Sequence, residues 1–257
     1  MTDTDYQLWA AAAGLVLSFI AAAHYFIAPR NTPSQTNPTW QQLFNENEQL
    51  LEFWETCKDY STIVITIQVY ILEQDESKIT EIGVSVSSLE DVLSIHSFNW
   101  PVKENFGSGH DGVMEPTHIF SFGPTRPVSE DSISSLLSTI FGRWTAPYER
   151  ACIVVHGMGH VLGFLNRYWK LPEDLPVFDT RRLSQFQHQG ADGRLEDCLR
   201  ELPSAELHDV LLGNAGNDSR YIMHLFRHLA RHSRKARQTA RVISKTKPRN
   251  HVYSLSQ

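Results

Sequence analysis

The chain has 257 residues, of which 41% are hydrophobic and 20% are charged, and its formal net charge is −6. This composition excludes a disordered, collagen-like or multi-span membrane protein, and the length predicts one large globular domain with appendages. Residues 219–257 contain ten Lys and Arg residues and no acidic residue, so an acidic body carries a basic C-terminal segment. Three widely spaced cysteines exclude a disulfide framework and favour a reducing compartment: Cys57, Cys152 and Cys198.

The N-terminus combines a short acidic segment, residues 1–7, with a stretch of 21 residues without formal charge, residues 8–28. A helix of this length rises about 30 Å, which is enough to cross the hydrocarbon core of a bilayer. We therefore predict a single membrane-spanning helix, in a membrane that the sequence does not name. Because Arg30 and the other basic residues follow the stretch, the positive-inside tendency predicts a cytosolic domain. A cleaved signal peptide and an Ala-rich soluble helix are the alternatives.

The first half of the remaining chain is rich in strand signals. Residues 29–60 begin with many Pro, Asn, Thr and Gln residues, which predicts a linker and a short cap. Residues 61–73 are a β-branched run, and after a turn-like QDESK sequence residues 79–88 form a second run, which together predict an antiparallel hairpin. A third strand is expected near residues 92–98, followed by a long loop over residues 100–128.

The second half alternates helices with short strands. A helix is predicted for residues 129–144, a buried strand for 151–155, a helix for 156–170 and a strand for 175–180. Residues 195–212 are typical of one or two amphipathic helices, and Asn214 begins a long final helix. This order predicts an α/β fold with one mixed, five-stranded sheet flanked by helices.

Several motifs occur in this same order, with a characteristic spacing. They are VITIQ (64–68), TEIG (80–83), VVHGMGHVLGFL (154–165), VFDT (177–180) and GNAGNDSRY (213–221). Together they resemble the ribonuclease H-like fold of the DEDD 3′–5′ exonucleases, and they are most similar to the fungal Gfd-type branch. The resemblance implies an exonuclease-like domain over residues 61–232, followed by a basic, partly disordered tail over residues 233–257.

The resemblance also implies where catalytic residues belong. Active members hold two divalent metal ions with several carboxylates, and a histidine serves as general base. The four positions that have lost these groups are Thr66, Gln68, Val161 and Gly213, and only Asp218 is retained. One carboxylate cannot hold two Mg²⁺ ions, so we expect no catalysis and no cofactor.

Other side chains could in principle restore a metal site. Asp218 with Glu73 or Glu81 would give a divergent nuclease that uses Mg²⁺ or Mn²⁺, although Glu81 belongs to the TEIG motif and is interpreted as structural, and Glu73 as a solvated strand-end charge. His156 and His160, four residues apart, could form a lone metal site with Asp218, or could be a buried or capping pair. Asp179 in VFDT matches a family position that orders the strand end.

The basic segment offers a second kind of site. Arg234, Lys235, Arg237, Arg241 and Lys245 follow the apolar stripe of the final helix. They could contact RNA phosphates or anionic lipid headgroups, or they could form a solvated tail that offsets the acidic body.

These features lead to three hypotheses. The first is a membrane-tethered, non-catalytic protein of the exonuclease fold that binds nucleic acid or a protein partner. The second is a divergent metal-dependent 3′–5′ exonuclease acting on RNA or DNA. The third is a structural scaffold that binds no nucleic acid, since a fold does not fix a function.

Overall fold

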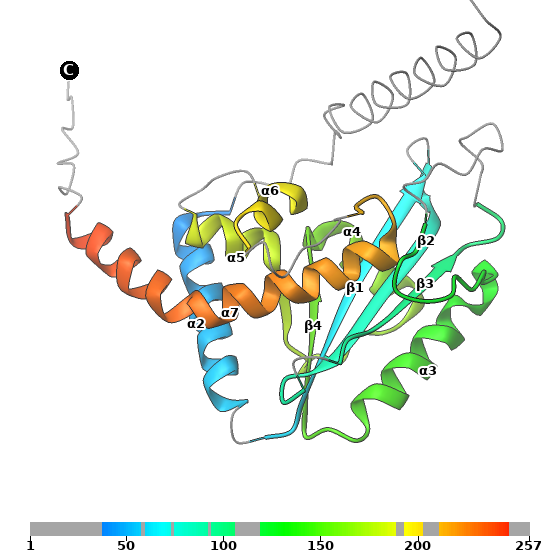
Figure 1. Ribbon diagram of the computed structural model, residues 1–257, viewed down its shortest axis with the longest axis horizontal. Coiled ribbons are helices and arrows are strands. Elements are labelled where there is room, and N and C mark those ends of the chain that lie inside the picture. The colour runs from blue at the N-terminus through cyan, green and yellow to red at the C-terminus, as the bar shows by residue number, and fades with distance from the viewer. Residues whose placement is uncertain are drawn as a thin grey trace, which may run out of the picture. The chain divides into compact units, whose positions relative to one another are not determined.

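The computed structural model describes residues 38–57, 60–72, 75–91, 94–105, 119–188, 193–202 and 211–246. They contain a five-stranded sheet with the strand order β3-β2-β1-β4-β5. Helices cover both of its faces (Figure 1). The predicted α/β fold with a mixed five-stranded sheet is therefore confirmed.

The first three strands are antiparallel neighbours: β1 (Thr62–Leu72), β2 (Asp75–Ser88) and β3 (His96–Pro101). This confirms the predicted hairpin. The third strand lies a few residues later than expected, because its pairing with β2 begins where His96 faces Val86. The other two strands, β4 (Arg150–Val155) and β5 (Val177–Asp179), run parallel to β1.

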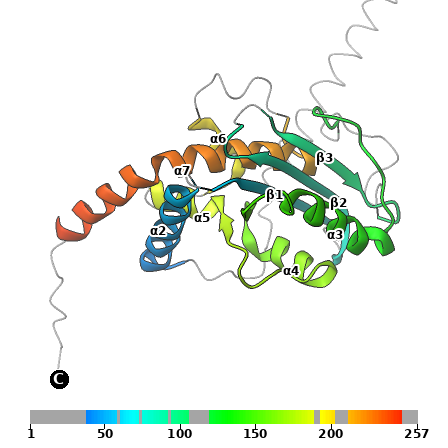
Figure 2. The same ribbon diagram turned by 90° about the horizontal axis from the view of Figure 1, so that it is seen from below.

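One face of the sheet is covered by α3 (Ile133–Thr145) and α4 (Met158–Tyr168). A short 3-10 turn, η2 (Glu130–Ser132), precedes α3. Ile63, Ile65 and Ile67 of β1 point to this face, since side chains alternate along a strand. Figure 2 shows the sheet between these two helices and α7.

The opposite face is covered by four helices, of which α7 is the longest. They are α2 (Trp40–Thr56), α5 (Thr180–Gln187), α6 (Leu195–Arg200) and α7 (Ala215–Thr246). The apolar stripe of α7, including Ile222, Phe226 and Leu229, packs with Val64 of β1 in a second hydrophobic core. Cys152 also lies fully buried in this core, and burial raises the pKa of its thiol well above the usual value.

Helix α2 lies inside the stretch that composition predicted to be a linker and cap. A capping box begins it: the Gln42 N–H lies 3.3 Å from the Thr39 hydroxyl oxygen, and the Thr39 N–H donates to the Gln42 side chain over 2.8 Å. Its buried residues recur at helical spacing, so the helix docks by an apolar face; they include Leu43, Leu50 and Phe53. The polar composition concealed this face.

Helix α7 continues through residue 232, where the resemblance placed the end of the domain, and ends at Thr246. The rest of the basic segment, residues 247–257, lies outside the described residues. In the part of the chain that the structure describes, no helix combines the length and apolar character that a membrane span requires. The predicted span, residues 8–28, also lies outside the described residues.

Candidate functional site

The first turn of α7 lies directly on β2, where the TEIG motif meets the Asn-Ala-Gly-Asn-Asp run. A Cβ atom at Gly83 would lie 1.8 Å from the backbone oxygen of Ala215, so no larger residue fits there without displacing the helix. On the helix side, a Cβ atom at Gly216 would lie 2.7 Å from the Cβ atom of Asn99. The two glycines thus allow the helix backbone to touch the sheet.

Glu81 holds this helix start in place. Its Oε2 accepts a hydrogen bond from the Ala215 N–H over 2.9 Å, and its Oε1 accepts from the side-chain amides of Asn99 and Asn214, each over 2.7 Å. A carboxylate at a helix N-terminus satisfies orphan N–H groups and suits the helix dipole. Burial nevertheless raises the pKa of Glu81, against the lowering effect of the Ala215 and Asn99 hydrogen bonds. The structural interpretation of Glu81 is therefore confirmed.

Asp218 lies one turn further along α7 and is only 4% exposed. Its Oδ2 accepts a hydrogen bond from the Tyr70 hydroxyl of β1, and its Oδ1 accepts from the Gly213 N–H over 3.2 Å. Gly213 has a φ angle of +96°, which lies in the left-handed region that favours glycine. Both oxygens of the retained carboxylate therefore contact donors from the chain itself.

Thr66 and Gln68 precede Tyr70 on the same face of β1, so they too lie beneath α7. The Thr66 hydroxyl is fully buried and donates to the backbone oxygen of Ser219 over 2.7 Å. The Oε1 atom of Gln68 is buried without a hydrogen-bond partner in the structure described. The two side chains that stand where the resemblance places an Asp and a Glu are thus neutral.

Val161 lies on the other side of the sheet. It is 2% exposed and packs in the core formed with Ile67 and Phe164. The structure therefore groups Thr66, Gln68, Gly213 and Asp218 at the contact between β1 and α7, and it places Val161 among apolar side chains.

A comparison of the sequence with known protein families identifies the family of this domain. Residues 63–229, more than half of the chain, match the DEDDh family described as DNA polymerase III subunit epsilon-like, C-terminal domain. The chain belongs to this family. No curated protein matches the chain.

Asp179 orders the end of β5 in this DEDDh-family domain, as the sequence predicted. One carboxylate oxygen accepts from the Gly157 and Arg181 N–H groups, each over 2.9 Å, and the other accepts from the Met158 N–H over 2.8 Å. The side chain therefore caps the starts of both α4 and α5. Its role in the structure is confirmed.

The two histidines of the second motif have separate surroundings. The Nδ1 atom of His156 lies 3.0 Å from the hydroxyl oxygen of Thr180, which links the end of β4 to α5. His160 lies in the first turn of α4 and is partly buried. Among the described residues, no group of three or more His, Cys, Asp or Glu side chains is placed to hold a metal ion. Glu73, one of the substitute ligands considered, lies outside the described residues.

The basic residues of α7 are divided between two surroundings. Arg234 forms an ion pair with Glu55 of α2, and the Arg237 Nε lies 2.9 Å from an oxygen of Glu48 on the same helix. These two arginines, predicted as contacts for nucleic acid or lipid, thus each pair with a glutamate of α2. The side chains of Arg241 and Lys245 are not among those described.

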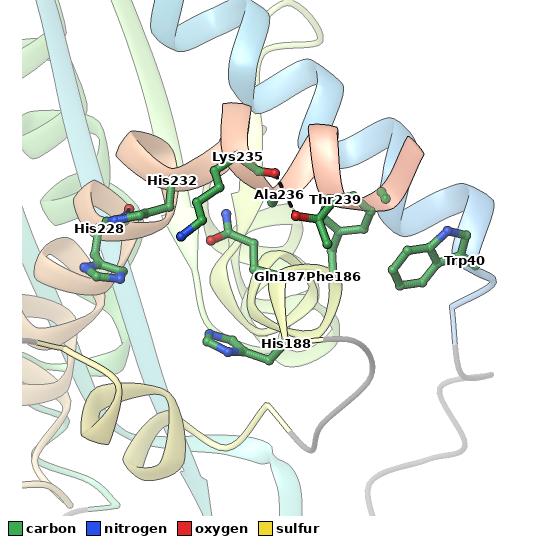
Figure 3. Close-up of a pocket in the computed structure, with 10 residues that line it drawn as sticks. Trp40, Phe186, Gln187, His188, His228, His232, Lys235, Ala236 and Thr239 are labelled. Atoms are coloured by element: carbon green, nitrogen blue, oxygen red, sulfur yellow. Dashed lines mark hydrogen bonds between the residues drawn. The ribbon is translucent and has the colours of Figure 1, made fainter. Parts of the chain in front are cut away.

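Lys235 lies on a different face of α7 and lines a pocket between α2, α5 and α7 (Figure 3). Its volume is about 220 Å³. The other residues of the pocket share no local pattern in the sequence, because they come from three segments far apart in the chain. They are Trp40, Phe186, Gln187, His188, His228, His232, Ala236, Thr239 and Ala240.

Proposed function

We propose that this DEDDh exonuclease-like protein is non-catalytic and that it acts by binding nucleic acid. The observation that carries the proposal is the environment of Asp218, the one carboxylate retained at the expected catalytic positions. Its two oxygens accept hydrogen bonds from Tyr70 and Gly213. The remaining expected positions offer a hydroxyl, an amide, an isopropyl group and no side chain at all: Thr66, Gln68, Val161 and Gly213.

This set of residues does not fit the two divalent ions on which active relatives of this fold depend. Mg²⁺ takes hard oxygen ligands, and two such ions close together require several converging carboxylates. Glu81 is a poor substitute because its two oxygens already accept three hydrogen bonds that hold the start of α7. Releasing it would leave three buried donors unsatisfied.

Two finer features complete the proposal. We infer that the chain is of the Gfd type, on the motifs quoted above. We also infer that residues 8–28 tether it to a membrane with the domain in the cytosol. Alkaline carbonate extraction of the tagged, full-length protein tests the tether, which would be abandoned if the protein were released into the soluble fraction.

The catalytic question is decided by a nuclease assay. The full-length chain, purified in mild detergent, is incubated with end-labelled single-stranded RNA and DNA in the presence of Mg²⁺ or Mn²⁺. We expect no shortening from the 3′ end. Asp218→Asn is the diagnostic variant, and Asp174→Asn, in the loop after α4, is its matched control.

The outcomes separate the hypotheses. Shortening that requires metal and disappears only in Asp218→Asn would establish the divergent nuclease and refute our proposal. Shortening that persists in Asp218→Asn and stays with the chain through further purification would also refute our proposal, and would assign the activity to other residues. If neither shortening nor binding of RNA or DNA is measured at physiological salt, the scaffold hypothesis replaces ours.

A further inference from the structure

The pocket between α2, α5 and α7 has two chemically different ends (Figure 3). Three imidazoles and an amino group gather at one end, and two aromatic rings lie at the other. None of the ten residues that line it is acidic. His228, His232 and Lys235 belong to the basic C-terminal segment, so the pocket lies in the basic part of an otherwise acidic chain.

The basic end is built on one face of α7. His228 and His232 are one turn apart, with their ring centroids 4.2 Å from each other. The Nδ1 atom of His232 lies 2.8 Å from the backbone oxygen of His228, and this contact fixes the orientation of the His232 ring. Lys235 follows on the next turn, and His188 enters from the end of α5. Three imidazoles and an amino group thus line the same pocket.

The aromatic end is formed by α2 and α5. Trp40, the first residue of α2, is 41% exposed, and its ring lies 5.0 Å from that of Phe186 at an angle of 33°. Phe186 is buried, so it supports the tryptophan from below. A half-exposed indole that is held in place by a buried ring is a suitable platform for stacking.

We propose that this pocket binds one nucleotide of a single-stranded nucleic acid, with a phosphate at the Lys235 end and a base against Trp40. The proposal rests on the proposed function, and it assigns that function a site. Single-strand binding proteins combine basic side chains for phosphates with aromatic side chains for bases. A volume of about 220 Å³ is below that of pockets that enclose a drug-sized ligand. It therefore suits a part of an open strand better than an enclosed free ligand.

The same observations favour nucleic acid over a membrane surface. Binding to anionic lipid depends on several unpaired basic residues spread over one surface. Here Arg234 and Arg237 form ion pairs with Glu55 and Glu48, and Lys235 lies on the pocket face. A lipid headgroup also has no planar group that would stack on Trp40.

The test compares three probes on the full-length protein in detergent: fluorescein-labelled oligouridylate, inorganic polyphosphate, and glycerophosphoserine, the water-soluble headgroup of phosphatidylserine. The variants are Lys235→Met and Trp40→Leu, with Trp40→Phe as the conservative partner. Lys170→Met, beyond the end of α4 on the other face of the sheet, is the matched control. Circular dichroism confirms that each variant is folded.

We expect Lys235→Met to weaken binding of both oligouridylate and polyphosphate about fivefold, because it removes a phosphate contact. Trp40→Leu should weaken oligouridylate binding about tenfold and leave polyphosphate binding unchanged, since only the base stacks. Trp40→Phe should retain most of the affinity, and Lys170→Met should match the wild type.

The failures are distinguishable. If the wild type binds oligouridylate and every pocket variant binds it equally well, the pocket assignment is wrong and the proposed function stands. If the wild type binds no nucleic acid at physiological salt, both are wrong. Glycerophosphoserine binding that is tighter than oligouridylate binding and lost in Lys235→Met would overturn the assignment in favour of a lipid headgroup.

Discussion

Replacing Glu81 by glutamine tests whether this carboxylate holds the fold or belongs to a hidden metal site. In the wild type, three buried N–H donors converge on its two oxygens, at distances of 2.7, 2.7 and 2.9 Å. Glutamine offers one oxygen and one amide nitrogen. If its oxygen serves Asn99 and Asn214, its nitrogen faces the Ala215 N–H, and two donors oppose each other.

The size of the effect follows from these contacts. A buried donor left without an acceptor costs about 1–3 kcal/mol, and here two donors are affected. Relief of the burial cost of the carboxylate, which raises the pKa of Glu81, offsets part of this loss. We expect Glu81→Gln to lower the free energy of unfolding by about 3 kcal/mol.

The pH dependence gives a second readout of the same variant. Because the pKa of Glu81 is raised in the folded state, its proton-linked stabilisation is complete below the ordinary value of 4.5 and is lost as the pH rises through the folded pKa. Glutamine lacks this dependence. The difference in stability between wild type and Glu81→Gln should therefore grow as the pH is lowered from 7 towards 4.5.

Urea unfolding, followed by tryptophan fluorescence at several pH values, measures both effects in the full-length protein. The matched control is Glu90→Gln, an exposed residue that follows β2, for which we expect a change within about 0.5 kcal/mol. The reasoning is refuted if Glu81→Gln is as stable as the wild type, or if the difference shrinks at lower pH.

Three further changes test other contacts of the fold by the same unfolding assay. Gly83→Ala should destabilise the protein by more than about 3 kcal/mol, because its Cβ would lie 1.8 Å from the Ala215 backbone oxygen; an equally stable variant would mean that α7 does not rest on β2 as described. Thr39→Ala should cost about 1 kcal/mol by removing the capping box of α2, and no loss would argue against that cap. His224 is partly buried on α7, and burial together with the charges of Arg220 and Arg227 lowers its pKa from 6.5 to about 4. The stabilisation linked to neutral His224 is therefore present above pH 6.5 and is lost as the pH falls towards about 4. Over that range the free energy of unfolding of the wild type should fall by about 2 kcal/mol more than that of His224→Gln. Parallel plots of stability against pH for the two proteins would contradict this.

Local patterns were sufficient to predict much of the fold. The β-branched runs on either side of a polar turn predicted β1 and β2, because strand alternation and turn chemistry are properties of neighbouring residues. The motifs also indicated structural roles for Glu81 and Asp179, which the hydrogen bonds confirm. These residues act on backbone groups at fixed places in the motif order, so a resemblance to a family was enough to find them.

Contacts between distant segments were beyond such patterns. Arg234 and Arg237 lie in a basic run. Nothing near them in the sequence indicates that they form ion pairs with Glu55 and Glu48. The pairing depends on α2, whose polar composition predicted a linker. For the same reason the pocket was not foreseen, since Trp40 reaches Phe186 only when α2 docks.

The first turn of α7 and its later turns therefore have different surroundings, although they belong to one continuous helix. At its first turn, uncharged side chains and a hydrogen-bonded carboxylate lie where the resemblance places metal ligands, and the helix is held by Glu81. Towards its last turns, glutamates of α2 pair with the arginines of one face. Exposed ion pairs of this kind contribute only about 0–1 kcal/mol each, so the apolar contacts of Leu50 and Phe53 must hold α2 in place. The pairs instead reduce the basic character of one face of α7, whereas Lys235 lies on the pocket face, beside three imidazoles and an indole.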